Sequence, residues 1–157
     1  MRRLLVPILL AAALVPAVAL AAPGAPSDGT VSVRNADGKV SVVARGSFIG
    51  YCDSCKIWVN DPDPTDGAAP TITNSEVSHS LTDTKTQYSG SSMRFRMVGG
   101  FWRMIIQGKG IDLSGIGHGQ VVLNGAGGST DGTYQFDGDT YRSMPDFELR
   151  FPLGIGN

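Results

Sequence analysis

The sequence predicts an all-β fold, a sandwich or barrel of about 8–12 short antiparallel strands. Apolar and polar residues alternate with a period of two along much of the chain, and no segment shows the 3.6-residue period of an amphipathic helix. Glycine, which favours turns, accounts for 21 of the 157 residues. Of the 14 acidic residues, 12 are aspartate, so glutamate, a good helix former, is scarce. We therefore do not expect a helical bundle.

The first 21 residues have the pattern of an export signal. Arg2 and Arg3 precede an apolar stretch at 4–18, and Ala19-Leu20-Ala21 is a small-residue cleavage site. This predicts export by the general secretory route to the cell envelope or the extracellular space. An uncleaved membrane anchor is the alternative. Residues 22–29 then form a short flexible tail.

Residues 30–157 are expected to form one β domain, because their number is typical of a single hydrophobic core. Without Arg2 and Arg3 the chain has 11 basic and 14 acidic residues. This mildly acidic balance argues against a general nucleic-acid binder, which needs a basic surface to displace counterions from phosphates. No apolar run after the signal is long enough to span a membrane.

The strands follow from the alternation. Residues 31–33 and 40–42 alternate around the turn-forming cluster Asn35-Ala36-Asp37-Gly38, a pattern typical of a β-hairpin. Residues 48–51 and 56–59 are a second pair of strands, with a short turn between them. Further strands are expected at 95–97, 102–106, 111–113, 121–123, 134–136 and 147–151.

Residues 30–61 and 94–125 align without a gap at an offset of 64, with apolar residues facing apolar residues at nine places. The two identities are Gly46 with Gly110 and Asn60 with Asn124. A true duplication would give two units that pack together to cover their apolar faces. The alternative is that two alternating segments fall into phase by chance.

Cys52 and Cys55 are expected to form a disulfide, because an exported chain with two cysteines three positions apart most simply joins them. Metal ligation is an alternative: a zinc site with two cysteine and two histidine ligands would use Cys52, Cys55, His79 and His118, and His118 lies in a turn that corresponds to the cysteine turn in the repeat alignment. Thiol redox chemistry is a third interpretation, although it requires a helix after the first cysteine.

The sequence contains no recognisable hydrolase, zinc-protease or phosphate-loop motif. We therefore predict a protein that is not an enzyme and has no cofactor. Phe101 and Trp102 point to opposite faces of a strand, so one of them is expected to be exposed. Together with His118 in its glycine-rich turn, this pair is the predicted binding surface.

The runs R-F-R-M-V-G-G-F-W-R, G-K-G-I-D-L-S-G-I-G-H-G and V-V-L-N-G lie between Arg94 and Gly125. They resemble segments of small exported β-proteins of high-GC Gram-positive bacteria. This resemblance implies export and a β fold, and brings no activity or catalytic residue.

The predicted function is a non-catalytic exported module that binds or builds in the cell envelope or extracellular space. A cell-envelope polymer and another protein are the partner classes that remain open. The alternative function is a metal-binding or thiol-dependent protein that uses Cys52, Cys55 and His118.

The signal makes a first testable prediction. We expect the exported chain to begin at or near Ala22, because cleavage follows the small-residue site at 19–21. Intact mass spectrometry of the exported protein measures this directly. A mass that retains residues 4–18 would contradict it.

Overall fold

The computed structural model describes residues 27–154 except residue 129, so the predicted signal lies outside the described residues. The described part contains eight strands, all paired antiparallel, and no helix. No helix in this part is therefore long and apolar enough to cross a membrane. The strands are β1 Gly29–Asn60, β2 Thr71–Thr73, β3 Val77–Ser80, β4 Lys85–Met97, β5 Phe101–Gly125, β6 Thr133–Phe136, β7 Arg142–Ser143 and β8 Leu149–Leu153.

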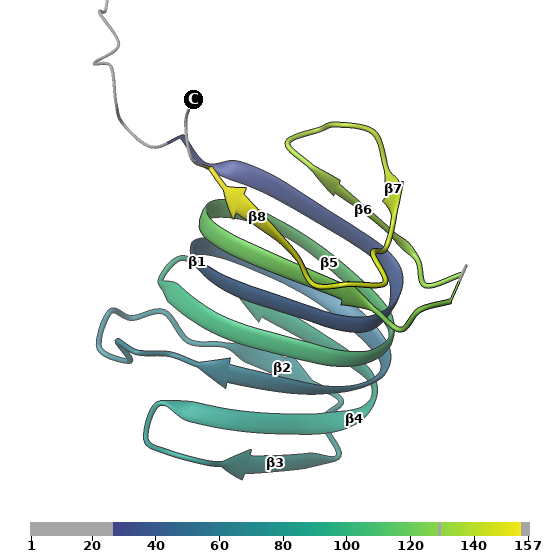
Figure 1. Ribbon diagram of the computed structural model, residues 1–157. Helices are drawn as coiled ribbons and strands as arrows, with labels where there is room; N and C mark the ends of the chain where they lie inside the picture. Colours follow the sequence, from purple (N-terminus) through teal and green to yellow (C-terminus); the bar gives the residue numbers. More distant parts are fainter. Residues whose placement is uncertain (1–26, 129, 155–157) are drawn as a thin grey trace, which may run out of the picture.

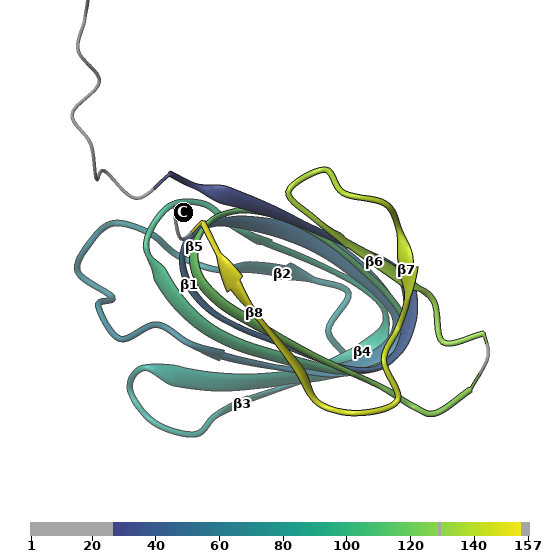
Figure 2. The same ribbon diagram turned by 45° about the horizontal axis from the view of Figure 1, so that its top comes forward.

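The two longest strands, β1 and β5, wind around each other as a coil (Figure 1). Gly117 of β5 lies opposite both Gly29 and Gly46 of β1, and Lys39 of β1 lies opposite both Gln107 and Asn124 of β5. Each strand therefore returns to the same partner after seventeen residues, the separation between positions 29 and 46 and between 107 and 124. The coil is flattened, so one turn crosses two opposite faces (Figure 2).

Different strands complete the two faces. On one face, the order is β6, the start of β1, the middle of β5, the middle of β1, the end of β4, and β2. On the other face, it is β8, the end of β5, then β1, the start of β5, the end of β1, the start of β4, and β3. β2 and β3 therefore cover the same end of the coil on opposite faces (Figure 2).

At one edge of the coil the two backbones are in direct contact. The amide of Gly46 donates a hydrogen bond to the carbonyl of Gly100 at 3.1 Å. A Cβ at Gly46 would lie 2.2 Å from the carbonyl oxygen of Ile116, and one at Gly117 would lie 2.2 Å from that of Arg45. Gly46 also has φ +156°, so glycine is required here for both space and conformation.

At the opposite edge each strand changes which side chains point inward. One turn of the coil contains seventeen residues, which is an odd number. Under strict alternation, a residue one turn after a core residue would therefore point outward. The chain corrects this with buried residues three positions apart instead of two: Val33 and Ala36, then Cys52 and Cys55. Asn35, between the first two, has φ 48°. The bend thus has the character of a β-bulge.

The core fills the space between the two faces. Its largest fully buried side chains are Trp102, Phe48 and Phe95, which come from β5, β1 and β4. Close packing of these strands removes the apolar side of every long strand from water, which is the main stabilising contribution. The other fully buried large side chains are Ile57, Met93, Met97, Met104, Ile106, Ile111, Leu113, Leu123 and Leu153.

The all-β class is confirmed, but the expectation of short strands is wrong for β1 and β5, which have 32 and 25 residues. The predicted hairpin over 31–42 is wrong for the same reason, because residues 35–38 bend β1 from one face to the next without reversing it. The bend replaces a reversal because β5 lies on both sides of β1 and pairs with it along its whole length. The duplication at an offset of 64 stays a prediction.

The glycine edge predicts a large cost for one added methyl group. Gly46→Ala is expected to lower the free energy of unfolding by about 3 kcal/mol, since it adds a backbone clash to an unfavourable φ. Gly67→Ala is the control, because Gly67 has φ +81° but open space around it. It should cost about 1 kcal/mol. Urea unfolding followed by tryptophan fluorescence compares the two, and equal costs would contradict the proposed contact.

Candidate functional site

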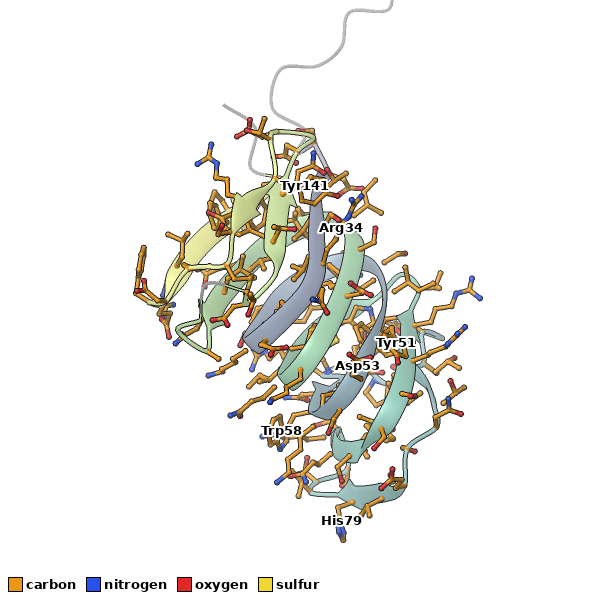
Figure 3. All side chains as sticks on the ribbon, turned by 90° about the vertical axis from the view of Figure 1, so that its right-hand side faces the viewer. Arg34, Tyr51, Asp53, Trp58, His79 and Tyr141 are labelled. Atoms are coloured by element: carbon orange, nitrogen blue, oxygen red, sulfur yellow. A yellow bond between two sulfur atoms is a disulfide. The ribbon has the colours of Figure 1, made fainter. Side chains whose placement is uncertain are left out.

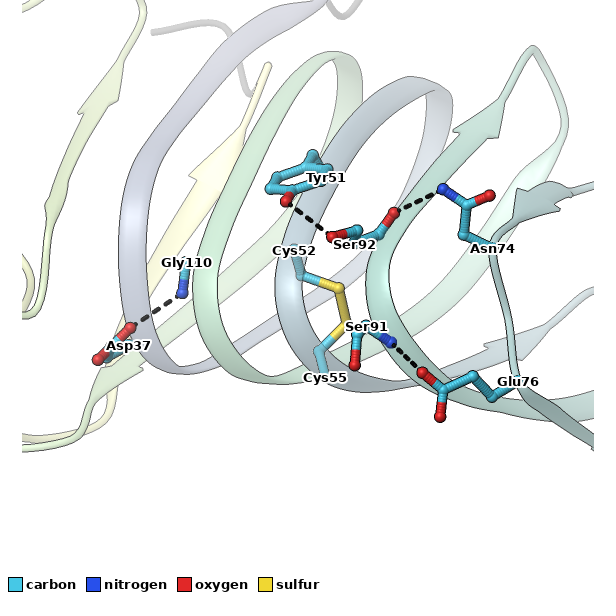
Figure 4. Close-up of a disulfide and its surroundings, with 9 residues drawn as sticks. All are labelled: Asp37, Tyr51, Cys52, Cys55, Asn74, Glu76, Ser91, Ser92 and Gly110. Atoms are coloured by element: carbon cyan, nitrogen blue, oxygen red, sulfur yellow. Dashed lines mark hydrogen bonds between the residues drawn. A yellow bond between two sulfur atoms is a disulfide. The ribbon is translucent and has the colours of Figure 1, made fainter.

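Cys52 and Cys55 form a disulfide within β1, which confirms the predicted pairing. The two sulfurs lie inside a bend, with Asp53 and Ser54 exposed outside it. β4 bends at the same place, where Met93 and Gly90 lie opposite the two cysteines (Figure 4). The predicted hairpin turn between the cysteines is wrong, because β1 continues through them. The disulfide therefore holds a bend of the coil.

The structure does not bring His118 to the cysteines. His118 lies opposite Arg45 near the glycine edge, and its Nδ1 is 3.5 Å from a carboxylate oxygen of Asp28. His79 lies on β3, at the end of the sheet. Among the described residues, no three His, Cys, Asp or Glu side chains gather as metal ligands would. With both sulfurs joined to each other, the metal interpretation lacks its proposed ligand set.

Phe101 and Trp102 lie on opposite sides of β5. Trp102 is fully buried, and its Nε1 donates a hydrogen bond to the carbonyl of Gly99. Its assignment to the binding surface is therefore wrong, because alternation along β5 places it in the core. Phe101 is half-buried on the outer side, with the guanidinium of Arg103 at 5.8 Å from its ring centre.

Two hollows lie side by side on the face that β2 and β6 complete. Their volumes are about 740 Å³ and about 610 Å³. They share Ser32, Ile49, Arg96 and Ser114, so they form one continuous open groove. We call this the arginine groove, since Arg34, Arg94 and Arg96 line it.

Cross-strand pairing orders the side chains of the groove in rows. In the first row, Asp112 lies opposite Tyr51, and Tyr51 lies opposite Arg94. A second row, one alternation further along the strands, crosses five neighbouring strand segments, two of them from β1, over about 19 Å at the usual strand spacing. It consists of Ser32, Ser114, Ile49, Arg96 and Thr71.

Tyr141 forms one wall of the groove (Figure 3). Its hydroxyl is 3.0 Å from the Oγ of Ser32, and the guanidinium of Arg34 lies 4.2 Å from its ring centre. The preceding loop is fixed by Asp139, whose pKa is lowered by the Thr140 backbone amide and by the charge of Arg142. These contacts place an aromatic ring and a guanidinium together at the rim, where both remain available to a ligand.

The three longest strands carry mainly basic residues. β1, β4 and β5 carry nine basic and three acidic residues. Two of the three acids bind backbone amides at bends: Asp37 accepts from Gly110 at 2.9 Å, and Asp112 accepts from Asn35 at 2.8 Å. None of Arg34, Arg94 and Arg96 has a carboxylate within 4.0 Å in the described part of the chain. The groove therefore presents three guanidinium groups to solvent.

Sequence reasoning missed this groove, since its lining comes from parts of the chain that are far apart in the sequence: 30–34, 47–51, 71–73, 94–98, 112–116, 135 and 141. Arg94 and Arg96 do show a local signal, two cations on the outer side of one strand. Nothing local places Arg34 and Tyr141 near them. Their proximity depends on the coil, which sets β1, β5 and β4 side by side.

Comparisons with known proteins add no relative. No family model, curated protein or solved structure matches the chain. The resemblance to small exported β-proteins of Gram-positive bacteria therefore stays a prediction.

The disulfide makes a prediction about stability. Replacing both cysteines with alanine should lower the free energy of unfolding by about 2 kcal/mol, the chain-entropy value for so short a loop. The fold should persist, because the surrounding core is shared by three strands. Urea unfolding of C52A/C55A against the oxidised protein measures the difference. Two titratable thiols in the exported protein, or a stoichiometric metal, would contradict the pairing.

Proposed function

We propose that the protein is an exported, non-catalytic binding module of the cell envelope or extracellular space, and that the arginine groove holds its ligand. The ligand is an anionic glycan, a polymer of sugars or polyols that carries carboxylate or phosphate groups. The observation that carries this proposal is the set of three arginines without carboxylate partners along one continuous groove.

The arginines select the charge of the ligand. A guanidinium binds carboxylate or phosphate through two parallel hydrogen bonds, a geometry that lysine does not offer. Arg94 and Arg96 lie two residues apart on one strand, and Arg34 lies on the other side of the groove. An anionic chain that crosses the strands can therefore be held at both sides.

The rest of the groove favours a glycan over a purely ionic partner. Hydroxyl groups line it throughout, and they suit the hydroxyls of a sugar. Tyr51 and Tyr141 offer aromatic rings, and Ile49, which is 56% exposed, offers an apolar floor for the C–H surface of a sugar ring. The hydroxyl-bearing residues other than tyrosine are Thr30, Ser32, Ser47, Thr71, Thr73 and Ser114.

The rigid frame of the groove suits binding without large rearrangement. Its floor consists of paired strands, and its one acid, Asp112, holds the backbone of Asn35. A preformed site loses little conformational entropy when a ligand binds. We therefore assign the groove a role in recognition and not in turnover.

The proposal predicts binding of acidic, but not neutral, polymers. Oligogalacturonate tests the carboxylate form and a glycerol-phosphate polymer tests the phosphate form, with dextran as the neutral reference. R94Q/R96Q should weaken binding of the acidic probe about 100-fold, since each charge-assisted contact contributes about 1.5 kcal/mol or more. Isothermal titration calorimetry measures the affinities.

The matched control is K56Q/R103Q, which removes two charges from the opposite face. It should bind the acidic probe with nearly the affinity of the unmodified protein. Equal losses in both double variants, equal affinity for dextran, or no binding of either acidic probe would contradict the groove as the site.

A further inference from the structure

The face opposite the arginine groove has its own pattern of charge. Two outer rows of this face carry cations: Lys39 and Lys56 lie on either side of Gln107, and Arg103 and Lys85 lie on either side of Asn60. Arg45 lies opposite Phe101, one alternation beyond the second row. We call this surface the cationic face, defined by Lys39, Arg45, Lys56, Lys85 and Arg103.

These five cations have no carboxylate within 4.0 Å in the described part of the chain. Glu148 lies in the small hollow at the rim of this face, and its carboxylate binds Arg150. Five like charges on one surface repel each other, a cost that an anionic partner would relieve.

An apolar row lies between the two cationic rows. Val122 and Ile105 both lie opposite Ser41, and Ile105 lies opposite Trp58. All three apolar side chains are partly exposed, and the neighbouring Val43 is 41% exposed. The indole Nε1 of Trp58 donates to Oε1 of Gln87 at 2.9 Å, which satisfies its polar atom. In Figure 3, Trp58 and Tyr51 lie on opposite sides of Asp53, the first on this face and the second in the groove.

Two hollows open on the cationic face. Lys56 and Trp58 line one of about 540 Å³, together with Glu76, whose carboxylate accepts a hydrogen bond from the amide of Ser91. Lys39 and Val122 line the other, of about 230 Å³. Each is smaller than either part of the arginine groove, about 740 Å³ and about 610 Å³.

We propose that the cationic face docks on the surface of an anionic lipid membrane. Anionic headgroups match the five cations, and the apolar row with Trp58 matches the interfacial region beneath the headgroups. A soluble polyanion would match the charges but leave the apolar row uncovered. The arginine groove lies on the opposite face, so a docked protein holds its groove away from the membrane.

This inference does not depend on the ligand of the groove. The test uses the exported protein without residues 1–21 and sedimentation with vesicles of phosphatidylcholine that contain about one-third phosphatidylglycerol. We expect binding to these vesicles at low salt, much weaker binding at high salt, and little binding to pure phosphatidylcholine. K56Q/R103Q should lower the affinity about 30-fold, the effect of two charges at an anionic surface.

R94Q/R96Q is the matched control, with the same loss of charge on the groove face, and it should bind the vesicles nearly as the unmodified protein does. W58S tests the apolar row, and its binding should fall while its thermal unfolding stays cooperative. Equal losses in the two double variants would show charge attraction without a defined face and would overturn the proposal. So would equal binding to pure phosphatidylcholine.

A glycerol-phosphate polymer separates the membrane from a soluble polyanion. Suppose that K56Q/R103Q no longer binds this polymer, and that neither the unmodified protein nor any variant binds vesicles. The cationic face then binds a soluble polyanion, and the membrane proposal is wrong. Binding of the acidic polymers to R94Q/R96Q tests the groove separately. If this variant binds them with unchanged affinity, the groove proposal is wrong, whatever the vesicle experiment shows.

Discussion

The fold depends on the close contact of two backbones at the glycine edge. Gly46 and Gly117 allow β1 and β5 to pass each other where any Cβ would overlap a carbonyl oxygen. This contact lets β1 bend around the core without reversing, so β5 can pair with it on both sides. Every other feature of the molecule, from the two faces to the place of the disulfide, follows from this continuous winding.

The opposite edge solves a different problem. Because each turn has an odd number of residues, strict alternation would point core side chains outward in the next turn. A step of three residues between buried positions, in place of two, keeps them pointing inward. The Cys52–Cys55 disulfide closes over one such step, with the bend of β4 directly beside it. Figure 4 shows that backbone amides near these bends bind acidic side chains, Gly110 to Asp37 and Ser91 to Glu76.

These bends explain why the sequence has many more aspartates than glutamates. The short aspartate side chain reaches backbone amides close to a bend: Asp131 accepts from Gly128, and Asp137 accepts from Thr30. Because bends and loops use the acids, the outer sides of the long strands keep mainly arginine and lysine. A chain with a slightly acidic total thus presents two basic faces, a property that its net charge hides. Both proposed binding surfaces depend on this separation.

The sequence by itself determined the all-β class and the pairing of the two cysteines. Alternation and a three-residue spacing are local, and they act whatever the partner strands are. Only the tertiary structure decided that residues 35–38 bend a strand instead of reversing it, and that Trp102 is core. It also decided that Arg34, Arg94 and Tyr141 line one groove. Glycines at positions 29 and 46, and at 100 and 117, do repeat at the spacing of one turn, a signal present in the sequence. Their meaning depends on pairing between segments that are distant in the chain, and two-residue alternation is the same in a hairpin and in a coil.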